Sequence, residues 1–153
     1  MTHDRYPQPP SQAIRSVKLA IANRAGHYLL LRRAADDKNR PGSLDLAGGG
    51  VDPLESPRQA AVREAWEELG IVLGEDQIKL LYPVRRPSSH GHINERHFGR
   101  VVLPDANPAI VLDPGEHSSY LWLPRDEARA SLTHQPLREG FVLATGHLAL
   151  ADL

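Results

Sequence analysis

The stretch of sequence that decides the fold reads Gly49-Gly-Val-Asp-Pro-Leu-Glu55 and continues, seven residues later, with Arg63-Glu64-Ala-Trp-Glu67-Glu68-Leu-Gly70-Ile71. Its first part is glycine-rich and predicts a turn where the backbone can approach another group closely. Its second part carries acidic residues at helical spacing. The stretch therefore predicts a loop, a helix and a second loop that form one unit.

The ends of the helix follow from its capping signals. Ser56 is a favourable N-cap, Pro57 suits the first helical position, and Gln59 stands where a capping box places a glutamine. Gly70 supplies the left-handed residue that commonly ends a helix. These signals predict a helix from Pro57 to Leu69, with an apolar side formed by Ala61, Val62, Ala65, Trp66 and Leu69.

Three glutamates of this helix, Glu64, Glu67 and Glu68, lie at positions i, i+3 and i+4, so their carboxylates share one face. Like charges at this spacing repel, and their convergence indicates a divalent cation; ligation by oxygen alone favours Mg2+ or Mn2+ over zinc. Arg63 lies four residues before Glu67 and can orient its carboxylate. A solvated helix face is the alternative, and it would be preferred without the glycines, the caps and Glu55.

From Gly49 to Ile71 the sequence resembles the signature box of the Nudix hydrolases at every defining position. The resemblance implies an α/β fold, an α/β/α sandwich with a mixed β-sheet. It also implies that water attacks phosphorus in a nucleoside diphosphate linked to another group. The resemblance implies that Glu67 and Glu68 are the principal metal ligands and that the carbonyl of Gly48 completes the coordination. It implies that Glu55 binds metal through water or braces the loop. Glu64 is implied as a further ligand or as the base.

A second region, Glu116-His117-Ser-Ser-Tyr120-Leu-Trp122-Leu123, resembles the distal segment of Nudix enzymes that cleave diadenosine tetraphosphate or dihydroneopterin triphosphate. A glutamate outside the box serves there as ligand or base, which nominates Glu116 for either role. His117 stays unassigned. Tyr120 and Trp122 alternate with leucines, a pattern that favours packing beneath a helix over contact with substrate. One departure from the family is Leu44-Asp-Leu-Ala47, where many members have Trp-x-x-Pro.

Several basic residues are candidates for phosphate binding. Arg96 and Arg100 share a strand face with Phe98, which could bind phosphates and stack on a base, although an ordinary half-exposed strand is the preferred interpretation. His90-Gly-His92 has a spacing that can bind transition metals, but a solvated loop is preferred. The full set of basic candidates comprises Arg32, Arg33, Lys38, Arg40, Arg96 and Arg100.

Composition is that of an ordinary enzyme domain. The chain has 153 residues, a formal net charge of −1 and no cysteine. This charge gives no general attraction to nucleic acid, and the lack of cysteine excludes disulfides and thiolate metal sites. No apolar run is long enough for a membrane span or a signal peptide, so no membrane partner and a cytoplasmic location are expected. Residues 1–12 are proline-rich and predict a flexible tail before a single domain at residues 13–153.

The remaining pattern predicts a hairpin followed by further strands and two helices. The predicted strands cover residues 16–22, 27–33, 44–47, 77–86, 95–103 and 119–123, and the helices residues 124–132 and 136–149, with an inward stripe of Leu137, Phe141 and Leu148. Such an order suits a mixed sheet between layers of helices.

Three functions are compatible with these features. The first is a Mg2+-dependent pyrophosphohydrolase acting on a small nucleotide-like substrate such as a nucleoside triphosphate, a dinucleoside polyphosphate or dihydroneopterin triphosphate. The second is an enzyme like isopentenyl diphosphate isomerase, which is disfavoured because those isomerases use a cysteine. The third is a non-catalytic nucleotide sensor, which is disfavoured because such modules usually lose box acids. Similar proteins are commonly dimers, so a homodimer is left open.

Overall fold

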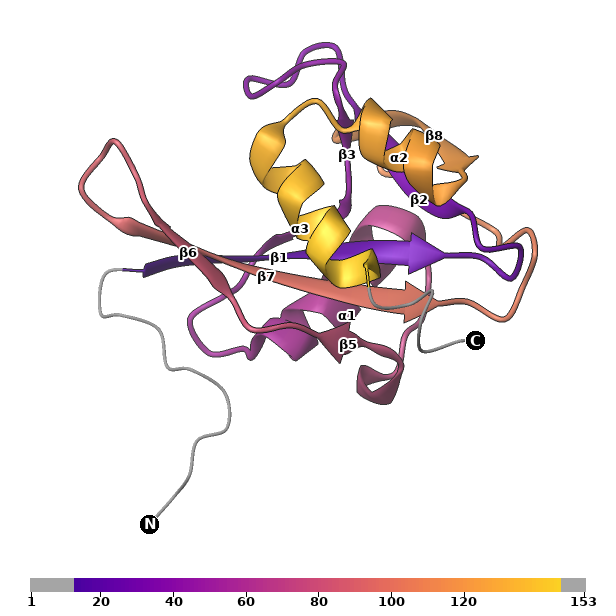
Figure 1. Cartoon of the computed structure of the whole chain (residues 1–153), viewed down its shortest axis with the longest axis horizontal. Helices are drawn as coiled ribbons and strands as arrows, with labels where there is room; N and C mark the ends of the chain where they lie inside the picture. Colours follow the sequence, from indigo (N-terminus) through magenta and orange to yellow (C-terminus); the bar gives the residue numbers. More distant parts are fainter. Residues whose placement is uncertain (1–12, 147–153) are drawn as a thin grey trace.

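The computed structural model describes residues 13–146 as one mixed β-sheet covered by helices on both faces (Figure 1). Its elements follow the order β1 (Ala13–Ala22), β2 (Tyr28–Arg33), β3 (Leu44–Asp45), β4 (Ala47–Gly50), α1 (Pro57–Leu69), η1 (Glu75–Gln77), β5 (Lys79–Leu80), β6 (Val84–Pro87), β7 (Ile93–Val102), β8 (His117–Leu123), α2 (Arg125–Ser131) and α3 (Gln135–Thr145). The predictions for residues 1–12 and for Leu148 lie outside the described residues.

The sheet is mixed, as predicted, because its long central strands β1 and β7 run parallel and its other pairs are antiparallel. β1 pairs with β2 only at Ala22 and Tyr28, and β4 takes the place beside β1 from Ser16 to Leu19. β2 continues instead with β3 and β8. The two halves of the sheet therefore separate after the first hairpin, and β4 leads from this opening into α1.

Alternation along β1 divides the core into two layers. Val17, Leu19 and Ile21 pack with α1, whereas Ala20 and Ala22 pack with α2 and α3 on the other face. Figure 1 shows α3 crossing in front of β1 and β7, with α1 behind the sheet. The predicted α/β/α sandwich is thus confirmed. No helix within residues 13–146 is both long and apolar enough to cross a bilayer.

The predicted boundaries of α1 are confirmed. The Ser56 hydroxyl accepts a hydrogen bond from the backbone N–H of Gln59, while the Gln59 side chain accepts one from the Ser56 N–H. Gly70 ends the helix with φ of 67°. The predicted apolar side was wrong at Trp66, which is 60% exposed because it lies at the edge of the buried stripe.

The prediction of one continuous strand at residues 77–86 was also wrong. The chain forms the 3-10 turn η1, then β5, and it pairs with β7 again only in β6. Pro83 lies directly before β6 and has no backbone N–H to donate to a ladder, which explains the interruption. The predicted inward positions of α3 are confirmed for Leu137 and Phe141, both of which are buried.

Candidate active site

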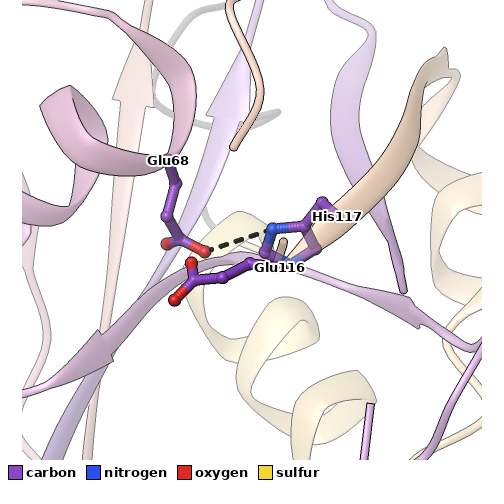
Figure 2. Close-up of side chains that lie close together, drawn as sticks. All are labelled: Glu68, Glu116 and His117. Carbon is purple, nitrogen blue, oxygen red and sulfur yellow. Dashed lines mark ion pairs between the residues drawn. The ribbon is translucent and has the colours of Figure 1, made fainter. Parts of the chain in front are cut away.

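Two elements distant in sequence bring acidic side chains together beside β4. Glu68 comes from the last turn of α1, Glu116 directly precedes β8, and His117 is the first residue of β8 (Figure 2). One potential ligand atom from each of these three side chains lies within 4.8 Å of the other two. The His117 Nδ1 atom is 3.4 Å from Glu68 Oε2. The structure therefore places the distal segment beside the box, and the role of Glu116 as ligand or base stays a prediction.

Two glycines of β4 permit this arrangement. Gly48 has φ of 140°, and a Cβ atom there would lie 1.9 Å from the carbonyl oxygen of Val17. Its N–H donates a 2.6 Å hydrogen bond to Glu68 Oε1. A Cβ atom on Gly49 would lie 2.5 Å from a carboxylate oxygen of Glu64. Gly48 thus lets β4 lie close against β1 while its N–H binds Glu68, and Gly49 lets the Glu64 carboxylate approach the backbone closely.

Arg63 forms ion pairs with acids in and before α1. Its Nη2 atom lies 2.6 Å from Glu55 Oε1, and its Nη1 atom lies 3.0 Å from Glu64 Oε1 and 3.1 Å from Glu67 Oε2. It also donates to the Gly50 carbonyl at 2.9 Å. The predicted orientation of Glu67 by Arg63 is present, and it extends to two further carboxylates. The guanidinium therefore fixes the direction in which these acids face.

The buried acids of the cluster are poorly compensated. Burial raises the pKa of Glu68 to about 8, and Glu64 and Glu116 add to this effect, while Lys18 and the Gly48 N–H oppose it. Burial likewise raises the pKa of Glu64, against the effect of Arg63. A bound cation would offset this excess of negative charge, and a set in which carboxylates outnumber the single imidazole of His117 suits a hard divalent ion. The residues present therefore fit Mg2+ or Mn2+.

A buried ion-pair group borders the acids on the other side. Asp45 lies 3.2 Å from Lys18 Nζ and 2.6 Å from Arg33 Nη1 and is fully buried. Lys18 also donates to the carbonyl of Leu46. Sequence reasoning missed Lys18 and Asp45, although each is a charged residue within an apolar run. Together with Glu68, Glu116 and His117, this ion-pair group lines a cavity of about 220 Å³.

His117 was unassigned and proves to be central. It is 4% exposed, and burial lowers its pKa, against the effect of Asp45. Its Nδ1 atom is buried without a hydrogen-bond partner among residues 13–146. This nitrogen faces Glu68 Oε2 at 3.4 Å, and an imidazole in that position can ligate a metal together with the carboxylate. Trp122 packs against the α1 side of the core, in agreement with the preferred packing role, whereas Tyr120 is 40% exposed.

The other candidate residues for phosphate or metal binding do not lie in one place. Arg32 is exposed and donates to the Gly42 carbonyl. Arg96 and Arg100 lie on β7, and the ring of Phe98 between them is 2% exposed beneath α3, so it offers no face for a base. His90 and His92 stack in the loop between β6 and β7, with ring centroids 6.3 Å apart.

Comparison with known proteins agrees with this geometry. The sequence model of the NUDIX domain matches residues 13–143. The chain is 37% identical to the CTP pyrophosphohydrolase of Escherichia coli (strain K12) over 73% of this chain and 77% of that protein. It is 45% identical to the nucleoside triphosphatase NudI of Klebsiella pneumoniae (strain 342), but that match spans only 37% of this chain and 40% of the relative.

Solved structures show the same fold. The MutT NUDIX hydrolase of Burkholderia pseudomallei superimposes with a TM-score of 0.67 at 30% identity, covering 86% of this chain and 97% of that one. The dihydroneopterin triphosphate pyrophosphohydrolase of E. coli gives 0.68 at 25% identity, covering 84% and 92%. The chain belongs to the Nudix hydrolase family, because the family model matches nearly all of the described residues and the signature box is complete.

Proposed function

We propose that the protein is a pyrophosphohydrolase that uses Mg2+ or Mn2+ to cleave a phosphoanhydride bond in a small nucleotide-like molecule. The observation that carries this proposal is the convergence of Glu68 and Glu116, from distant elements, beside the acids that Arg63 holds on α1. The relatives whose names specify an activity include a CTP pyrophosphohydrolase and a dihydroneopterin triphosphate pyrophosphohydrolase. Both activities break phosphoanhydrides, which supports the same reaction class here.

The proposed ligand roles come from the family resemblance; within residues 13–146, Glu68 and Glu116 are the two of these carboxylates that lie in one cluster, with His117. The metal would be held by Glu67, Glu68 and Glu64, with the Gly48 carbonyl, Glu55 and Glu116 as further ligands directly or through water. Such an ion supplies charge neutralisation on the phosphates and acidifies a water molecule. Arg63 keeps the carboxylates oriented, and Arg33, which lines the cavity and is paired with Asp37 and Asp45, adds positive charge beside the phosphate oxygens.

We assign the base role to Glu116. It lines the cavity, is exposed, and receives no side-chain hydrogen bond among residues 13–146, so its carboxylate is free to accept a proton from water. Glu64 is the alternative base, but Arg63 already holds it at 3.0 Å. A homodimer and a cytoplasmic location remain predictions.

The direct test is a phosphate-release assay coupled to alkaline phosphatase over a panel of nucleotides and pyrophosphate-linked compounds. We expect hydrolysis of at least one compound with Mg2+ and none with chelator. An isomerase would release no phosphate from any of them but would shift the double bond of isopentenyl diphosphate. A sensor would bind a compound of the panel without turnover.

Metal should stabilise the fold in a pH-dependent way. The pKa of Glu68 is about 8 in the folded protein against an ordinary value of 4.5, so its contribution to stability is full below pH 4.5 and is lost as pH rises through 8. A bound cation would offset that loss. We therefore expect Mg2+ to raise the melting temperature by several degrees, and more at pH 8 than at pH 6.

Thermal scans with and without Mg2+ at both pH values check this result. A Glu67→Gln/Glu68→Gln double variant is the comparison, because it removes two proposed ligands. An equal metal-induced shift in both proteins would place the cation elsewhere.

The Glu116 assignment predicts a selective loss of turnover. Glu116→Gln is nearly isosteric and should fold normally, whereas turnover should fall about a hundredfold with a smaller change in KM. The pH dependence of turnover for this variant is measured beside that of Glu64→Gln. If Glu116→Gln behaves as wild type while Glu64→Gln loses the acidic limb of its pH profile, Glu64 is the base instead.

A further inference from the structure

A second cavity opens on the α3 face of the sheet, and its polar lining is basic. It has a volume of about 300 Å³. Lys18 lines both this cavity and the one beside Glu68, so the two meet at this side chain. The polar side chains of the second cavity are Ser16, Lys18, Asn39, Arg40, Arg96 and His134, and no carboxylate lines it.

The positive charge of this cavity is not neutralised from within. Lys18 is paired with Asp45, whereas Arg40 and Arg96 form no ion pair with any residue in the described range 13–146. Asp45 and Asp37 act on Arg40 through their charges but do not line the cavity, and Glu139 lies with Arg96 in an adjoining pocket, where it accepts a hydrogen bond from Gln135. The two guanidiniums therefore remain available to an anion from solution.

Arg40 has the features of a side chain held ready for a ligand. It adopts φ of 56°, a conformation uncommon for residues other than glycine. Its carbonyl accepts hydrogen bonds from the N–H and the hydroxyl of Ser43, which hold this turn in place. Its Nη1 atom is buried and has no hydrogen-bond partner among residues 13–146. A buried donor without a partner is costly, and a phosphate oxygen would satisfy it.

We propose that the cavity formed by Arg40, Arg96, Lys18 and His134 binds a phosphate group of the substrate that lies outside the anhydride being cleaved. The substrate class is then a nucleotide-like molecule with at least one further phosphate, long enough to reach from the acidic cluster past Lys18. This inference rests on the proposed function for the identity of the ligand. The phosphate site itself does not depend on that function.

His134 provides a readout that does not need catalysis. Burial lowers its pKa, and the positive charges of Arg40, Arg96 and Arg33 lower it further, against the effect of Asp45. A phosphate bound beside the imidazole favours its protonated form. Phosphate should therefore raise the pKa of His134, which NMR can follow through its ring protons.

The first experiment uses inorganic phosphate and metal-free protein, so that the acidic cluster has no cation to recruit the anion. Binding is measured by calorimetry and by the NMR titration of His134. We expect saturable binding that Arg40→Met and Arg96→Met each weaken at least about tenfold. Arg129→Met removes the same charge from an exposed position of α2 and should bind as wild type.

Arg40 lies in a loop, so its variant tests the site even if Arg96→Met fails to fold. Absence of saturable binding, or equal binding by wild type and Arg40→Met, would overturn the proposal.

The second experiment distinguishes a substrate phosphate from a site for free phosphate. For whichever compound of the panel is hydrolysed, Arg40→Met should raise KM about tenfold with little change in kcat, and inorganic phosphate should compete with substrate. Binding of phosphate with an unchanged KM would overturn the substrate assignment. If wild type hydrolyses nothing yet binds phosphate at this cavity, the proposed function fails while the phosphate site stands.

Discussion

Replacing Glu68 with glutamine is expected to lower turnover about a thousandfold, equivalent to about 4 kcal/mol in the activation barrier, while the fold stays intact. Glu68 is the most buried acid of the box and lies closest to the distal residues Glu116 and His117. Glutamine retains the shape and can still accept the hydrogen bond from the Gly48 N–H. It removes only the negative charge that a cation would need.

The raised pKa of Glu68 explains why the fold should tolerate this change. With a pKa of about 8, the carboxyl group is mostly protonated in the metal-free protein at pH 7, and glutamine resembles that neutral form. The metal-free variant should therefore melt at or above the wild-type temperature at pH 8. The loss of activity would then reflect the site and not the stability of the protein.

Steady-state turnover at saturating Mg2+ checks this result for the purified variant. Glu75→Gln in η1 is a matched control, because it removes the same charge from an exposed side chain and should leave turnover unchanged. Turnover of Glu68→Gln within a few-fold of wild type would refute the ligand role. A decreased melting temperature in the metal-free state would refute the argument from its pKa.

The difference between what sequence reasoning predicted and what it missed has a physical reason. The helix α1 was predictable because its boundaries depend on local signals, the Ser56 cap and Gly70. A helix also converts sequence spacing into a common face, which is why Glu64, Glu67 and Glu68 were expected together, and the catalytic role of these acids stays a prediction. Both depend on residues close together in the chain.

The missed residues depend on contacts between distant segments. Asp45 is buried because Lys18 and Arg33, which pair with it, come from two other strands. Nothing within the short segment around Asp45 reports these partners. A charged residue inside an apolar run indicates only that it needs a partner of opposite charge. Which residue becomes that partner depends on how β1 and β2 separate in the folded sheet.

The same distinction applies to the basic residues. Arg32 and Arg33 are neighbours in sequence, yet only Arg33 lines the cavity beside Glu68, because successive side chains of a strand point to opposite faces. Arg96 borders the second cavity, whereas Arg100 lies further along β7, opposite Lys79. Sequence spacing predicts which residues share one face of a strand. The helices and loops that cover this face determine which of its arginines lines a cavity.

Gly48→Ala is expected to cost roughly 3 kcal/mol or more in the free energy of unfolding. The new Cβ atom would lie 1.9 Å from the Val17 carbonyl oxygen, a backbone atom that cannot move without breaking the pairing of β1 with β4. The φ of 140° is also unfavourable for any residue with a side chain. For a chain of this size the melting temperature should fall by about 6 °C or more.

Gly50→Ala is the matched control for this prediction. It lies two residues later in the same glycine run, and a Cβ atom there would meet nothing within 4 Å. Its expected effect is neutral or slightly stabilising, because alanine restricts the unfolded chain. Thermal unfolding of both variants without metal decides the matter, since equal melting temperatures would show that Gly48 is not sterically required. A large loss confined to Gly48→Ala would explain the glycine run through β4, whose backbone must fit against β1 while its N–H holds Glu68 in place.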